Sequence, residues 1–220
     1  MRNRCLLACS VALVVGVAST SQGALLGLTF YAPPDITVGF IDVTYDAGTD
    51  QFDAVGFALQ MDDGNPPPKT IATPGYNFLL NATVDSAGNL TPGGSFIVTG
   101  VVTLNSITYG TSNPLLTGVV SQFGYGDTPA NYDLLEIVIT LTGGDLAIPA
   151  YYGLPGTQIG LDFDANYGGA FSGSFASSFD NLGGFGPGFG TGQCDIKPIP
   201  EPISMVLMLG AVAAGLRRRV

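Results

Sequence analysis

The stretch "TVGFIDVTYDAGTDQFDAVGFALQ", residues 37–60, indicates the fold class of this chain. Its first part places Ile41, Val43 and Tyr45 at alternate positions, which is typical of a strand with one buried face. The turn-forming residues 46–50 follow, and the apolar pattern returns in residues 51–60. Two strand patterns joined by a short polar turn predict a β-hairpin.

The same alternation recurs further along the chain. A second hairpin is expected from residues 76–84 and 95–104, and further strands from residues 114–126, 134–144 and 169–179. Short strands interrupted by Gly, Pro, Asp and Asn are typical of all-β domains. We therefore predict that residues 24–179 form a single β-sandwich of about nine antiparallel strands.

The first 23 residues have the three regions of a secretory signal peptide. Arg2 and Arg4 come first, an apolar stretch from Cys5 to Val17 follows, and small residues precede Gly23. The pattern predicts export and cleavage after Gly23, with the next residue as the alternative position.

Residues 200–220 have the pattern of a membrane segment. The run Ile203–Leu216 carries no charge and is followed directly by Arg217, Arg218 and Arg219. As a helix it would span about 21 Å, less than the ~30 Å of a bilayer core. Pro200 suits the beginning of such a helix. An apolar helix that ends in basic residues indicates a membrane segment with its arginines on the cytoplasmic side.

A signal peptide combined with Pro200, Glu201, Pro202, an apolar helix and terminal arginines resembles the PEP-CTERM family of exported bacterial proteins. The resemblance covers the tail and implies a sorting route. It implies a precursor held transiently in the inner membrane and processed by an exosortase, a membrane-embedded transpeptidase-like enzyme. The product would lie on the surface or in the extracellular matrix of a Gram-negative bacterium that makes exopolysaccharide. A permanent tail anchor is the alternative.

The charge of the body restricts its partners. The whole chain has a formal charge of −10. Residues 24–199 keep sixteen of the seventeen acidic residues but only Lys69 and Lys197 among the basic ones, a formal charge of −14. A body this acidic repels nucleic acid and anionic lipid, which excludes both as partners.

The composition also argues against an enzyme. The chain has no histidine, so Ser-His-Asp and Cys-His arrangements are excluded. Glu136 is the only glutamate of the body, and its strand pattern places it on a solvated outer face. We predict a non-enzymatic protein, with a carboxylate-based glycosidase as the third alternative.

A calcium site is a candidate at residues 162–169. Asp162, Asp164 and Asn166 stand at alternate positions, as the first oxygen ligands of calcium loops do. However, Tyr167 replaces the glycine of such loops, and Gly173 replaces the bidentate glutamate. A plain strand explains the alternation better, so no cofactor is expected.

Residues 180–199 are rich in Gly and Phe and predict a flexible linker that presents the Pro-Glu-Pro motif. Cys194 lies in this range, where we expect a free thiol, with pairing to another molecule as the alternative.

Together these features predict a non-enzymatic cell-surface or extracellular-matrix protein. The alternative function is a carbohydrate-binding module associated with exopolysaccharide. Tyr151, Tyr152 and Tyr167 are expected in loops and would be its aromatic platform, although buried tyrosines explain them better.

Overall fold

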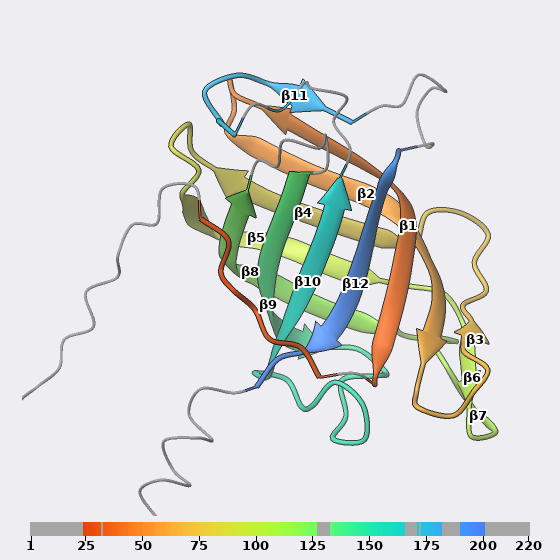
Figure 1. Cartoon of the computed structure of the whole chain (residues 1–220). Coiled ribbons are helices and arrows are strands. Elements are labelled where there is room, and N and C mark those ends of the chain that lie inside the picture. The colour runs from red at the N-terminus through yellow and green to blue at the C-terminus, as the bar shows by residue number, and fades with distance from the viewer. Residues whose placement is uncertain are drawn as a thin grey trace, which may run out of the picture.

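The computed structural model describes residues 24–31, 33–126, 133–165, 171, 173–181 and 190–200. This part of the chain is all-β (Figure 1). Its strands are β1 (Asp35–Asp46), β2 (Gln51–Asp62), β3 (Lys69–Thr70), β4 (Phe78–Val84), β5 (Leu90–Val98), β6 (Val102–Leu104), β7 (Ile107–Tyr109), β8 (Leu116–Gly126), β9 (Asp133–Gly143), β10 (Gln158–Ala165), β11 (Phe179–Asp180) and β12 (Gly192–Pro198).

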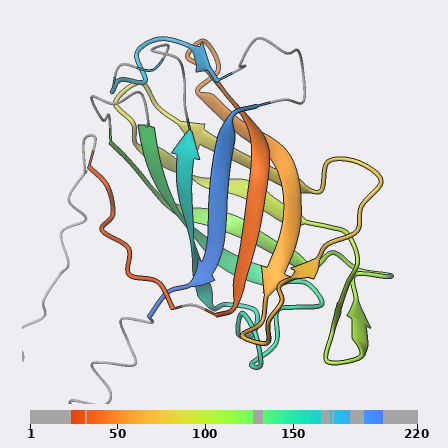
Figure 2. The same cartoon turned by 45° about the vertical axis from the view of Figure 1, so that its right-hand side comes forward.

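The main sheet closes into a barrel, so the predicted β-sandwich is wrong. Eight strands pair in the order β1, β2, β4, β5, β8, β9, β10 and β12, and β12 pairs back with β1. Every pairing is antiparallel, and Figures 1 and 2 show the strands surrounding one interior. Alternation along a strand reveals a buried face in either fold, but it does not show that the last strand meets the first.

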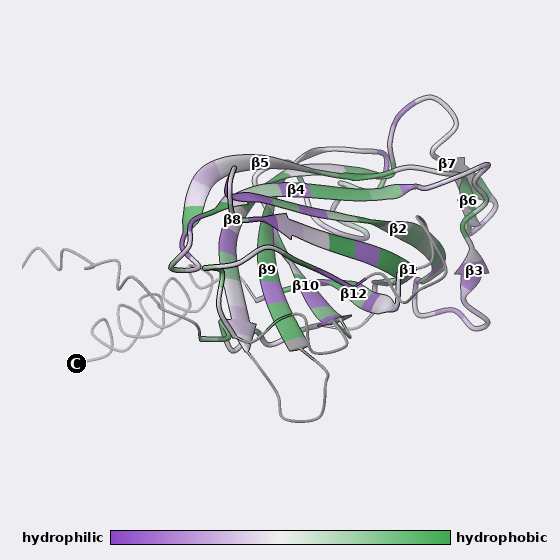
Figure 3. Ribbon diagram, turned by 90° about the horizontal axis from the view of Figure 1, so that it is seen from above, coloured by the Kyte–Doolittle hydropathy of each residue, from purple (hydrophilic) through white to green (hydrophobic). Residues whose placement is uncertain are grey.

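The barrel interior is filled by the inward-facing side chains of its strands. Phe78 lies near the centre of this core, with its ring centroid 6.2 Å from that of Phe96 and 5.9 Å from that of Phe163. Apolar and polar residues alternate along the strands in Figure 3, as one buried and one solvated face require. The predicted hairpin of residues 37–60 is confirmed as the β1–β2 pair.

The linker predicted at residues 180–199 is wrong over β12. Gly192–Pro198 forms the strand that closes the barrel, with Ile196 opposite Ile36 of β1 and Leu161 of β10. Cys194 is a free cysteine with only 3% of its surface exposed, and its burial raises the pKa of the thiol. In this seven-residue segment only Gly192, Cys194 and Ile196 alternate as inward positions. That pattern is too short and too weakly apolar to predict a strand.

The strand predicted at residues 169–179 is also wrong over its described residues, which form only the start of β11 at Phe179. The phenylalanines pack across one end of the barrel. The ring of Phe175 lies 4.8 Å from Tyr45 and 4.8 Å from Tyr125, and Phe171 lies 4.8 Å from Phe179. This aromatic cluster closes the barrel end over the core.

Two irregularities, or β-bulges, interrupt the first hairpin. β1 carries one more residue than either neighbour between Val38 and Asp42. Phe40 lies inside this bulge with a φ of 54°. β2 carries an extra residue where Leu59 stands between two paired positions. A bulge leaves backbone groups without their ladder partners.

Two buried asparagines supply hydrogen bonds beside these bulges. The side chain of Asn181 accepts a bond from the Val43 amide at 2.6 Å and donates to the Ile41 carbonyl at 3.0 Å. Asn77 accepts from the Ala58 amide at 2.7 Å and donates to the Ala58 carbonyl at 3.1 Å. Each asparagine therefore pairs the backbone of one bulged strand.

No helix in the described part of the chain is long and apolar enough to cross a membrane. The predicted signal peptide at residues 1–23 and the predicted sorting helix Ile203–Leu216 lie outside the described residues. So do Glu201, Pro202 and the arginines at 217–219.

Replacing Asn77 should destabilise the barrel strongly. Asn77→Ala leaves the amide and carbonyl of Ala58 unpaired, and also removes the bond to the Thr99 carbonyl. We expect the free energy of unfolding to fall by about 2–4 kcal/mol, measured by chemical denaturation. Asn65→Ala, in an exposed loop, is the control and should cost less than about 1 kcal/mol. Equal losses in the two variants would contradict this role of Asn77.

Candidate functional site

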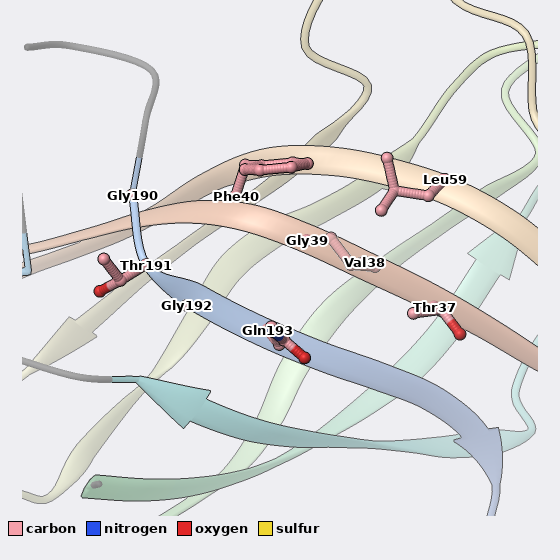
Figure 4. Close-up of a pocket in the computed structure, with 9 residues that line it drawn as sticks. All are labelled: Thr37, Val38, Gly39, Phe40, Leu59, Gly190, Thr191, Gly192 and Gln193. Atoms are coloured by element: carbon pink, nitrogen blue, oxygen red, sulfur yellow. The ribbon is translucent and has the colours of Figure 1, made fainter. Parts of the chain in front are cut away.

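A groove lies on the outer wall where β1, β2 and the start of β12 meet (Figure 4). Its volume is about 490 Å³. Phe40 and Leu59 stand on one side of the groove and Thr191 and Gln193 on the other, with Gly39 between them. One side is therefore apolar and the other carries a hydroxyl and an amide.

Two glycines keep the floor of the groove low. A Cβ at Gly39 would lie 3.0 Å from Cδ1 of Leu59, so any side chain there would crowd the apolar side. A Cβ at Gly190 would overlap the carbonyl of Ile41, so only glycine lets the chain pass this close to β1. The groove therefore depends on the absence of side chains at both positions.

The apolar side continues into an aromatic strip, formed by Phe40, Phe57 and Tyr76. The ring centroids of Phe40 and Phe57 lie 6.5 Å apart with the rings near perpendicular, and those of Phe57 and Tyr76 lie 4.9 Å apart. Phe40 is 55% exposed and Tyr76 is 46% exposed. Large aromatic surfaces are thus held in solvent beside the groove.

No residue that lines the groove carries a charge. This contrasts with the formal charge of −14 on residues 24–199. The groove is therefore a neutral area on an acidic body.

The proposed calcium residues lie elsewhere, on the outer face of β10. Asp162 and Asp164 are exposed, and Asn166 lies outside the described residues. Asp162 stands opposite Glu136 of β9 and Asp195 of β12. Although Asp162 is exposed, the surrounding barrel wall reduces the solvation of its carboxylate and raises its pKa, and repulsion by Glu136 raises it further. Among the residues that the structure describes, no group of three acidic or cysteine side chains is arranged to hold a metal ion.

Glu136 binds the N-terminal segment rather than facing open solvent. Its carboxylate accepts hydrogen bonds from the amide of Gly27 at 2.6 Å and from that of Leu28 at 3.3 Å. The amide of Tyr31 also donates to the Pro198 carbonyl at 2.9 Å. Residues 24–31 are thus held against the barrel wall by Glu136 and by the end of β12.

A small ion-pair network lies near the same end of β12. The Lys197 ammonium is 2.7 Å from the Asp195 carboxylate and 3.5 Å from that of Asp35. Burial raises the pKa of Asp35 to about 6, and repulsion by Asp195 adds to this, while Lys197 opposes it. One oxygen of Asp35 has no hydrogen-bond partner. The ionised form of the Asp35 carboxylate is therefore disfavoured in the folded protein.

Tyr151 and Tyr152 do not form an aromatic platform, as the preferred interpretation of buried tyrosines predicts. Tyr152 is buried and donates its hydroxyl to the Ile196 carbonyl at 3.1 Å. The half-buried Tyr151 packs at 5.8 Å on the ring of Tyr109, and Tyr167 lies outside the described residues. The described tyrosines 151 and 152 therefore stabilise the barrel.

Sequence reasoning missed the aromatic strip, and alternation alone does not reveal it. Phe40 is out of phase with the buried Ile41, Val43 and Tyr45 but in phase with the buried Val38, so the pattern assigns it to neither face. The change of phase between Val38 and Ile41 was the one signal of a bulge, and it is the bulge of β1 that turns Phe40 outward.

Comparison of the chain with protein-family models, with curated proteins and with solved structures finds no match.

The stability of the barrel should depend on the ionisation of Asp35. Because the pKa of Asp35 is about 6 in the folded state and its ordinary value is 3.8, the folded state binds the proton more tightly than the unfolded chain does. The stabilisation that comes from protonated Asp35 is therefore fully present below about pH 4 and is lost as the pH rises through about 6.

Asp35→Asn removes this titration. The free energy of unfolding of Asp35→Asn minus that of the unsubstituted chain should rise by about 1 kcal/mol from about pH 4 to about pH 7. This value allows for screening of the charge by solvent. Chemical denaturation at the two pH values measures the change. Asp63→Asn, in an exposed loop, is the control for surface charge. A difference independent of pH would show that Asp35 does not titrate in this range.

Proposed function

We propose that this chain is an exported, non-enzymatic protein of the cell surface or extracellular matrix, sorted and processed through its tail. The observation that carries the proposal is the position of β12. This strand ends at Pro198, and the Pro200–Pro202 motif begins two residues later. A complete barrel is thus followed at once by the sorting motif and the apolar segment.

The proposed route has three steps. The signal peptide directs the chain across the inner membrane, and the segment Ile203–Leu216 then halts in the bilayer with the arginines at 217–219 in the cytoplasm. An exosortase-type enzyme cuts at Pro200–Pro202 and transfers the barrel to the surface. Because β12 belongs to the barrel wall, the enzyme would have to reach the few residues after Pro198.

Neither Glu136 nor the groove beside Phe40 supports the glycosidase alternative. Glu136 is engaged by the amides of Gly27 and Leu28. A glycosidase needs a pair of carboxylates that flank a bound sugar, whereas the residues that line the groove are uncharged. Carbohydrate binding is the second candidate function, and the exposed aromatic strip favours it.

The tail should be required for delivery and absent from the product. Intact mass of the surface-associated protein should lack residues 1–23 and the segment from Ile203 onward. Truncation after Pro200 keeps β12 and should release a folded barrel into the periplasm or medium. Truncation after Asn181 removes β12 and should prevent folding, which separates a sorting defect from a folding defect.

The arginines provide a finer test. Replacing Arg217, Arg218 and Arg219 with Gln should reduce retention of the precursor in the membrane, because positive charge determines the orientation of the segment. Lys69→Gln, at the first residue of β3, is the matched control and should be processed normally. If most of the surface protein still carries the three arginines, the tail is a permanent anchor.

A further inference from the structure

We propose that the groove beside Phe40 and Leu59 binds a neutral saccharide chain. The aromatic strip would stack on the sugar rings, and the opposite side of the groove would form hydrogen bonds to their hydroxyls. This proposal names a class of ligand for the proposed surface protein. It rests on the proposed function, because the chain would encounter the saccharide at the cell surface or in the matrix.

The two exposed apolar side chains of the groove both belong to β-bulges. Phe40 stands in the bulge of β1, and Leu59 is the extra residue of β2. Bulges frequently redirect a side chain beside a binding site. Two bulges in neighbouring strands thus bring a phenylalanine and a leucine to the same groove (Figure 4).

Phe40 is held in a conformation that folding alone does not favour. Its φ of 54° lies in the left-handed region, where a bulky side chain is disfavoured. With 55% of its surface exposed, burial of the ring offsets little of this cost. A strained, exposed aromatic residue is a reason to infer a function for its side chain.

The two sides of the groove match the two kinds of surface on a sugar. A pyranose ring has a face of C–H groups, which pack on the electron-rich face of an aromatic ring. Its edge carries hydroxyls, which need donors and acceptors. The amide of Gln193 supplies both, and the hydroxyl of Thr37 adds another.

Charge selects a neutral occupant. An anion would be repelled by the acidic body, and a cation would find no carboxylate among the lining residues. The volume of about 490 Å³ lies within the range of small-ligand sites, about 300–1,000 Å³.

Size argues against a second copy of the chain. Phe40, Tyr76 and Leu59 are 55%, 46% and 38% exposed. Since a large side chain buries about 150–250 Å², they offer roughly 300 Å². A stable protein interface takes about 800 Å² from each partner, of which about 56% is apolar, so these three side chains supply too little apolar area for one.

The test uses the full chain, purified in a detergent without a sugar head group. Binding to cellohexaose, maltohexaose, laminarihexaose and mannohexaose is measured by titration calorimetry. We expect at least one to bind. Phe40→Asn removes the ring but suits the left-handed backbone, so the barrel should keep its melting temperature. It should bind at least about tenfold more weakly, as should Gln193→Ala on the opposite side.

Tyr31→Asn is the matched control, because Tyr31 is 59% exposed and does not line the groove. It should bind like the unsubstituted chain. The proposal is overturned if no oligosaccharide binds, if Phe40→Asn binds normally, or if Tyr31→Asn loses as much affinity. It is also overturned if the strip instead mediates a dimer that Phe40→Asn dissolves. None of these outcomes bears on the sorting tail, which is tested by the mass of the exported protein.

Discussion

A closed sheet requires that every strand find a backbone partner on both sides, and the rest of this structure depends on that requirement. In the first hairpin the bulges of β1 and β2 interrupt this pairing, and there Asn181 and Asn77 provide hydrogen bonds. They are the only polar residues among the buried ones that the structure describes. Without them, the bulges that carry Phe40 and Leu59 would leave buried amides and carbonyls unpaired.

The packing of the barrel explains why aromatic residues have opposite roles in one chain. Phe78, Phe96 and Phe163 fill the interior, and the cluster around Phe175 closes one end. The core and the barrel end are filled without Phe40, and its ring stays 55% exposed. Burial therefore does not explain why a phenylalanine stands at this position, whereas the proposed ligand does.

The sequence predicted the local structure well and the closure poorly. Alternation identified the first hairpin, because a half-buried strand repeats every two residues. It could not distinguish a barrel from a sandwich, because closure depends on a pairing between Ile36 and Ile196 that no local pattern encodes. The glycines of residues 180–199 led to the prediction of a linker, so β12 was not predicted as a strand. Glu136 was placed correctly on the outer face, but its contact with the Gly27 amide is a tertiary feature.

The closing strand also has a consequence for folding during the proposed export. Ile36 and Ile196 lie about 160 residues apart in the chain, so the barrel has high contact order and a large entropic cost of loop closure. In the proposed export, a chain that crosses from its amino terminus would keep one edge of β1 unpaired until the last strand has crossed the membrane. During this interval the open edge can pair with other chains. A membrane anchor just beyond Pro198 would keep β12 close to the unpaired edge of β1. It would also keep each molecule apart from its neighbours until the barrel has closed.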